Sequence, residues 1–116
     1  MIKHIDRGFG WLLVVGGLLH AFGALKAYEP QTPILVWSLS GSFAAVLLAA
    51  INLLRINRAH DRMLATVCFA GCLCWIAIAL AFGLSIGHLL DPRVMYHAIV
   101  ALVLAVFSAR DAFHHD

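Results

Sequence analysis

The sequence predicts an all-α integral membrane protein, built as one bundle of four transmembrane helices. Of its 116 residues, 63% are apolar and only 12% are charged, whereas soluble domains are about 45–50% apolar and about 25% charged. The apolar residues also fall into four long runs separated by short polar stretches. A soluble fold of this length could not bury so much apolar surface. The composition therefore excludes a disordered chain and a nucleic-acid-binding module, and we expect no nucleic-acid partner.

Three of the four apolar runs are long enough to cross a bilayer as helices. A hydrocarbon core of about 30 Å needs about 20 helical residues, and the first three runs hold 20, 22 and 25 residues. The fourth holds 16 residues, or about 24 Å of helix, and the flanking Arg93 and Arg110 can extend to the headgroups. Strands would leave unpaired backbone groups in lipid, so all four runs are expected to be helices. The predicted spans are 8–27, 33–54, 63–87 and 94–109.

The connectors between the runs carry turn and capping signals. The first contains Pro30 and Pro33, and Pro33 suits the first turn of the next helix. The third contains Gly87 followed by Asp91 and Pro92, which is typical of one helix ending and another beginning. No connector is long enough to separate two domains, so residues 1–116 are predicted to form a single domain.

Basic residues predict the orientation of the chain. Six lie in the N-terminal segment, the second connector and the C-terminal segment: Lys3, Arg7, Arg55, Arg58, Arg62 and Arg110. Only Lys26 and Arg93 lie beside the first and third connectors. Short cytoplasmic segments are enriched in Lys and Arg. We therefore expect a multi-pass protein of a bacterial inner membrane with both termini in the cytoplasm.

Small and polar residues recur at helical spacing in every run. Small side chains let membrane helices approach closely, and polar ones bond across the contact. We expect these stripes to face one another, with the Leu, Val, Ile and Phe faces toward lipid. The four stripes are Gly16, His20, Gly23 and Ala27; Ser38, Ser42, Ala45, Ala49 and Asn52; Ala65, Cys68, Cys72, Trp75 and Ala79; and His97, Ala101, Ala105 and Ser108.

The three cysteines lie within seven residues of one run, as Cys68, Cys72 and Cys74. Residues so close on one helix cannot form a disulfide with each other. No CxxC motif is present, so neither a disulfide framework nor a zinc site is indicated. We interpret the cysteines as packing residues and predict no metal site.

Histidines within the spans are the main candidates for function, because intramembrane ionisable residues are rare and usually functional. With both termini in the cytoplasm, His20 lies about 10 Å from the outer end of the first predicted helix. His97 lies about 5 Å from the outer end of the fourth. Ser38 lies at a similar outer level. His20, His97 and Ser38 are therefore the predicted cofactor-binding residues.

Two cofactors suit these residues. Histidines from different helices can ligate a haem iron, here haem b, from both sides. Alternatively, a histidine beside a serine can hydrogen-bond the carbonyl of a quinone. Both cofactors imply a redox role, as a membrane subunit for electron transfer.

In size and four-helix plan the chain is similar to the small multidrug resistance exporters. The resemblance is confined to architecture, since those exporters use a glutamate within the first helix and this first helix has His20 in the middle instead. Every carboxylate is expected in a loop or tail, so a proton-coupled exporter would lack its charged group. The acidic residues are Asp6, Glu29, Asp61, Asp91, Asp111 and Asp116.

The function that the sequence favours is that of an accessory subunit, which stabilises a larger membrane complex. The small-residue stripes suit packing against other subunits or self-association within the bilayer, and the connectors are too short to hold a separate active site. No nucleophile–base pair, phosphate loop or buried carboxylate pair is recognised, so autonomous catalysis is not expected. The redox subunit and the small four-helix transporter remain alternatives.

Overall fold

The computed structural model describes residues 1–114, and this part of the chain is helical apart from its ends and short connectors. Each helix is long and apolar enough to cross a membrane. The prediction of an all-α chain with four candidate membrane spans is therefore confirmed. The helices are α1 (Ile2–Ala27), α2 (Pro33–Ile56), α3 (Arg62–Ser85) and α4 (Pro92–Phe113).

Two helices extend well beyond the apolar runs that predicted them. α1 begins at Ile2 rather than near residue 8, and α4 continues to Phe113 and holds 22 residues. The apolar run alone predicted a short fourth helix, and this prediction is wrong. Apolar runs stop at charged residues, but Asp6 in α1 and Asp111 in α4 are paired with arginines, so both helices continue past them. α3 ends slightly early, at Ser85, before Gly87 with its φ of +70°.

The beginnings of α2, α3 and α4 are fixed by their own side chains. Thr32, Asp61 and Asp91 each accept a hydrogen bond from a backbone N–H of the first turn, at 3.4, 3.0 and 2.9 Å. These bonds satisfy backbone donors that have no partner within the helix. Pro33 and Pro92 occupy first-turn positions, where no backbone N–H is needed.

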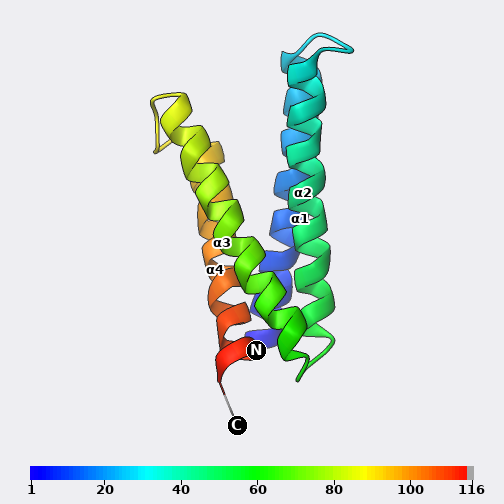
Figure 1. Ribbon diagram of the computed structural model, residues 1–116, viewed down its shortest axis with the longest axis vertical. Helices are drawn as coiled ribbons and strands as arrows, with labels where there is room; N and C mark the ends of the chain where they lie inside the picture. The colour runs from blue at the N-terminus through cyan, green and yellow to red at the C-terminus, as the bar shows by residue number, and fades with distance from the viewer. Residues whose placement is uncertain (115–116) are drawn as a thin grey trace.

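The helices form two hairpins, α1 with α2 and α3 with α4. In Figure 1 the hairpins lie together at the end that holds both termini and the 57–61 connector, and they diverge toward the other two connectors. We call these the closed end and the open end. The molecule is elongated, with principal extents of 51, 25 and 23 Å. The divergence leaves the inner faces of the hairpins unpacked toward the open end.

The buried core joins the two hairpins in the middle and toward the closed end. It includes Leu13, Ala49, Leu104 and Ala105, which come from three helices. The predicted stripes on α2, α3 and α4 are confirmed as buried, with Ser38, Trp75 and His97 only half-buried. Small residues on these stripes let the helices approach closely.

The predicted stripe on α1 is only partly correct. A Cβ atom on Gly16 would lie 2.6 Å from the ring of Tyr96, so Gly16 is at a close helix contact. A Cβ atom on Gly23 would have no atom within 4 Å. Gly23, His20 and Ala27 are all exposed. The physical reason is the divergence of the hairpins, which removes the packing partner of α1 toward the open end.

The expectation that every carboxylate lies in a loop or tail is wrong for two residues. Asp6 lies in the second turn of α1 and is 2% exposed. Asp111 lies in the last turn of α4 with its side chain 31% exposed. Both remain within helices because Arg55 pairs with both and Arg110 pairs with Asp111, so that two cations balance the two carboxylates. Asp116 lies outside the described residues.

Candidate functional site

A cleft of about 380 Å³ lies between the hairpins toward the open end. Residues of all four helices line it, and it includes the three residues predicted to bind a cofactor: His20, Ser38 and His97. Trp37 and Trp75 also line it, so two aromatic faces flank the polar groups. Ligand sites are commonly apolar clefts of this size with a few convergent polar groups.

His20 is held from α2 by a hydroxyl. Its Nδ1 lies 2.7 Å from the Oγ of Ser42, and Ser42 Oγ donates to the carbonyl of Ser38 at 3.3 Å. A serine has one hydroxyl proton. If that proton serves the Ser38 carbonyl, His20 donates through Nδ1 and carries a lone pair on Nε2. None of the described residues hydrogen-bonds this Nε2, so it is available as an acceptor at the cleft.

His97 has the opposite arrangement. The indole Nε1 of Trp75 donates to His97 Nδ1 at 3.2 Å. An indole N–H is a donor only, so Nδ1 accepts and a neutral His97 carries its proton on Nε2. The ring of His97 also contacts the rings of Trp75 and Tyr96, each with centroids 5.6 Å apart. This aromatic packing fixes the orientation of the imidazole.

The two imidazoles lie close together across the hairpins. Their centroids are 6.4 Å apart and their planes are nearly perpendicular, at 86°. With the proton of Ser42 on the Ser38 carbonyl, His20 presents an acceptor to the cleft. The Nε2–H of His97 is a donor that already interacts with the backbone of Gly16, so a ligand carbonyl would bind it by replacing Gly16.

Iron ligation fits His97 less well than hydrogen bonding. A metal-binding histidine usually donates its second ring N–H to an acceptor, but His97 accepts at Nδ1 and is protonated at Nε2, so no lone pair remains for iron. The ring is also packed against Gly16, since a Cβ there would lie 3.1 Å from His97 Cε1. Within residues 1–114, no group of three His, Cys, Asp or Glu side chains is placed to hold a metal ion.

Arg93 lines the cleft at its rim, beside the third connector. An ion pair with Asp91, at an N–O distance of 3.0 Å, holds Arg93 in place. The Arg93 guanidinium also lies 5.4 Å from the centre of the Phe82 ring. His88, near the same connector, is exposed and does not line the cleft. The cleft therefore has one cation at its rim and two imidazoles deeper inside.

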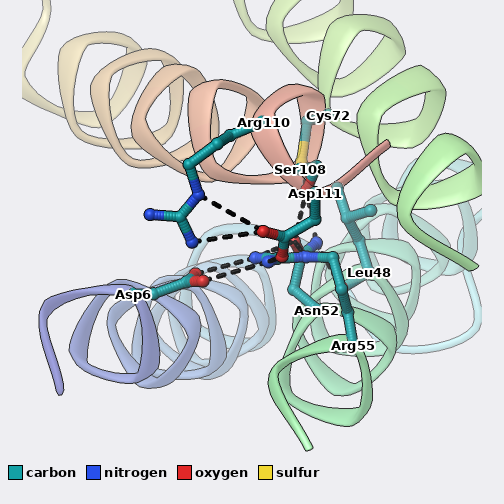
Figure 2. A network of polar contacts seen from close by, with 8 residues as sticks. All are labelled: Asp6, Leu48, Asn52, Arg55, Cys72, Ser108, Arg110 and Asp111. Atoms are coloured by element: carbon teal, nitrogen blue, oxygen red, sulfur yellow. Dashed lines mark hydrogen bonds and ion pairs between the residues drawn. The ribbon is translucent and has the colours of Figure 1, made fainter. Parts of the chain in front are cut away.

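A second polar site lies at the closed end, and it is not among the sites predicted from the sequence. Arg55 lies in the last turn of α2, is 1% exposed and sits between two carboxylates. Its Nη2 donates to Asp6 Oδ1 at 2.7 Å and its Nη1 to Asp6 Oδ2 at 3.0 Å. Nη1 also donates to Asp111, which pairs with Arg110 at 3.1 Å (Figure 2). Two cations and two anions thus balance one another.

Asn52 extends this arrangement to the remaining helix. Its Oδ1 accepts from Arg55 and from Ser108 Oγ, the latter at 3.1 Å. Its Nδ2 donates to the Leu48 carbonyl at 3.0 Å and contacts Cys72 Sγ of α3 at 3.6 Å. Residues of all four helices therefore meet here (Figure 2). We call Asp6, Asn52, Arg55, Ser108, Arg110 and Asp111 the Arg55 network.

A signal for this network is present in the sequence. The predicted stripe on α2 ends at Asn52, and one more helical step of three residues reaches Arg55. The stripe on α4 ends at Ser108, and the same step reaches Asp111. Extending each stripe by one turn would have placed opposite charges on the inner faces of two helices.

The comparisons with known proteins identify no relative. No protein-family model matches the chain, and no curated protein or solved structure matches it. The geometry therefore defines the chain by class, as a four-helix bundle of membrane-spanning length with a cleft at one end and a buried charge network at the other.

Proposed function

We propose that the protein is an accessory subunit of a membrane complex and that its cleft binds a quinone. The observation that carries this proposal is the pairing of His20 and His97, which come from different hairpins, line one cleft and lie 6.4 Å apart. The Nε2–H of His97 suits the carbonyl oxygen of a quinone, which would replace the backbone of Gly16 as its acceptor. The Nε2 lone pair of His20 suits the hydroxyl proton of the corresponding quinol.

The rest of the cleft supports a quinone over a purely polar ligand. Trp37 and Trp75 provide flat apolar surfaces for a ring. A volume of about 380 Å³ is sufficient for a ring and the beginning of its tail. Because the hairpins diverge, an isoprenoid tail can leave between them into lipid. The orientation expected from the basic residues would put this opening in the outer leaflet.

The subunit role follows from the chemistry that a quinone requires. Quinone reduction takes two electrons and two protons, so a bound quinone needs an electron donor, which we assign to a partner subunit. The outer surface of the bundle offers contact area for one. Phe43 of α2 is 69% exposed, and Leu47 of the same helix is also exposed. These side chains can pack against lipid or against a partner helix.

Tryptophan fluorescence tests the proposed ligand, because two of the three tryptophans line the cleft and Trp11 does not. A short-tailed quinone added to the purified protein in detergent should quench the emission saturably. Trp11→Phe should retain this quenching, whereas Trp37→Phe should lose part of it. An alkyl alcohol with the same tail should neither quench nor compete.

Collisional quenching within the micelle is the alternative outcome. In that case the quenching would rise without saturation and would be equal in the Trp11→Phe and Trp37→Phe variants. That result would overturn the quinone proposal.

A small four-helix transporter is the second candidate, and one observation favours it. The cleft opens between the hairpins, whereas the opposite end is closed by the ion pairs of Arg55 with Asp6 and Asp111. Sites closed on one side and open on the other are typical of alternating access. Uptake of a fluorescent organic cation into proteoliposomes under a proton gradient tests this candidate. Uptake no faster than into empty vesicles would exclude that substrate class.

A further inference from the structure

We propose that the closed end carries a binding site for the headgroup phosphate of an anionic phospholipid. A hollow of about 810 Å³ lies there, beside the Arg55 network and separate from the cleft. Its lining comes from the first two turns of α1, the end of α2, the 58–62 segment and the end of α4. The site therefore lies where helix ends emerge from the bilayer, at the level of lipid headgroups.

The charges around the hollow favour an anion. Five Lys or Arg residues and three Asp residues line it. Two of the carboxylates, Asp6 and Asp111, are paired with Arg55 and Arg110. The third, Asp61, accepts from the backbone N–H of Leu64 at the start of α3. The excess of positive charge therefore remains for a ligand.

Two cations are free to supply it. Among the described residues, no carboxylate lies within ion-pair distance of Lys3 or Arg58. Both side chains are exposed and line the hollow from opposite elements, α1 and the 57–61 connector. His60, between the helices, lines the same hollow in a left-handed conformation with φ of 78°.

A phospholipid suits the site better than free phosphate because exposed apolar residues are sequence neighbours of the residues that line the hollow. Ile2 adjoins Lys3 in α1, Met63 adjoins Arg62 in α3, and Phe113 ends α4; all three are exposed. Acyl chains can lie along these faces while the phosphate contacts the cations. Basic pockets at the ends of membrane helices are a known form of anionic headgroup recognition.

Lipid titration of the purified full chain in a neutral detergent tests the proposal. Native mass spectrometry would measure binding of a short-chain phosphatidylglycerol and of the matching phosphatidylcholine. We expect clear preference for phosphatidylglycerol, weakened by added salt. Each cation near an anionic lipid strengthens binding about fivefold. Lys3→Gln should therefore weaken phosphatidylglycerol binding about fivefold, and Arg58→Gln by a similar factor.

The matched control is Lys26→Gln, which removes the same charge from the opposite end of the molecule. It should leave phosphatidylglycerol binding unchanged. Equal binding of the two lipids, or an equal loss in Lys3→Gln and Lys26→Gln, would overturn the proposed site. Displacement of phosphatidylglycerol by inorganic phosphate at equal concentration would also overturn it, because the acyl chains would then contribute nothing.

Discussion

Arg55 in α2 forms a two-pronged ion pair with Asp6 in α1, with N–O distances of 2.7 and 3.0 Å. The planar guanidinium matches the carboxylate geometry, which makes such a pair both strong and specific in orientation. Because the two residues are 1% and 2% exposed, neither charge is solvated by water. The pair therefore fixes how the end of α2 sits against the start of α1, and Asp111 ties α4 to the same group.

Loss of the Arg55 guanidinium should strongly destabilise the bundle. In Arg55→Gln, Asp6 is left buried without its counter-charge, and breaking a buried pair in this way costs about 3–5 kcal/mol. Thermal unfolding of the purified protein in detergent measures the effect. The control Arg58→Gln removes an exposed arginine a few residues away and should change stability by no more than about 0.5 kcal/mol.

A double variant distinguishes two causes of the lost stability, the unpaired charge of Asp6 and the lost packing of the Arg55 side chain. Asp6→Asn combined with Arg55→Gln removes both charges of the pair while keeping polar groups of similar size. It should recover part of the stability lost in Arg55→Gln. If Arg55→Gln unfolds at the same temperature as Arg58→Gln, the buried pair does not hold the closed end together.

The same substitution should destabilise the protein at one glycine of α1 and be tolerated at another. Gly16→Leu forces a side chain against Tyr96 and His97 and should destabilise the protein by about 1–3 kcal/mol. Gly23→Leu adds a side chain where no atom lies within 4 Å and should be tolerated. Unfolding midpoints of both variants in detergent provide the comparison. Equal losses at the two positions would mean that the hairpins do not diverge beside Gly23.

The start of α4 should be sensitive to acid. The side-chain hydrogen bonds and then the backbone hydrogen bond from Arg93 lower the pKa of Asp91 to about 2, from about 3.9 in an unfolded chain. A lowered carboxyl pKa stabilises the fold above about pH 4, and this contribution is lost as the pH falls toward 2. Asp91→Asn keeps a capping oxygen but does not ionise. The stability difference between wild type and Asp91→Asn should therefore shrink between pH 4 and 2; a constant difference would contradict this.

The orientation of the chain can be tested with reporter fusions. From the excess of basic residues at the closed end, we expect both termini and the 57–61 connector to lie in the cytoplasm. Reporters fused at Glu29 and at the C-terminus should therefore report opposite compartments. The same compartment for both positions would rule out four membrane crossings.

The helices and most packing faces could be predicted from the sequence because both depend on local pattern. Ala45 and Ala49 on α2, and Ala101 and Ala105 on α4, recur at helical spacing and are buried as expected. The Arg55 network could not be predicted from the apolar runs, because charged residues interrupt these runs and so mark the limits of the predicted spans. Pairing between residues about 50 positions apart, such as Asp6 and Arg55, depends on how the helices are arranged in three dimensions.

The candidate cleft was predictable only in part. His20, Ser38 and His97 were selected by chemistry and depth, and all three line the same cleft. The divergence of the hairpins was not predictable, because Gly23 and Ala27 have the same small-residue pattern as the packed part of α1. The bond from Trp75 to His97, which favours hydrogen bonding over iron ligation, also required the structure, since the two residues lie on different helices.

The most direct test of the account is the quinone content of the purified protein. Protein purified in mild detergent from quinone-producing cells would be extracted with organic solvent, and the quinone would be quantified by chromatography and absorbance. The account predicts about one quinone per chain in wild type and a large loss in His20→Gln and in His97→Gln, with unfolding temperatures close to that of wild type. Quinone content that is equal in wild type and both variants would contradict the account and leave His20 and His97 as packing residues.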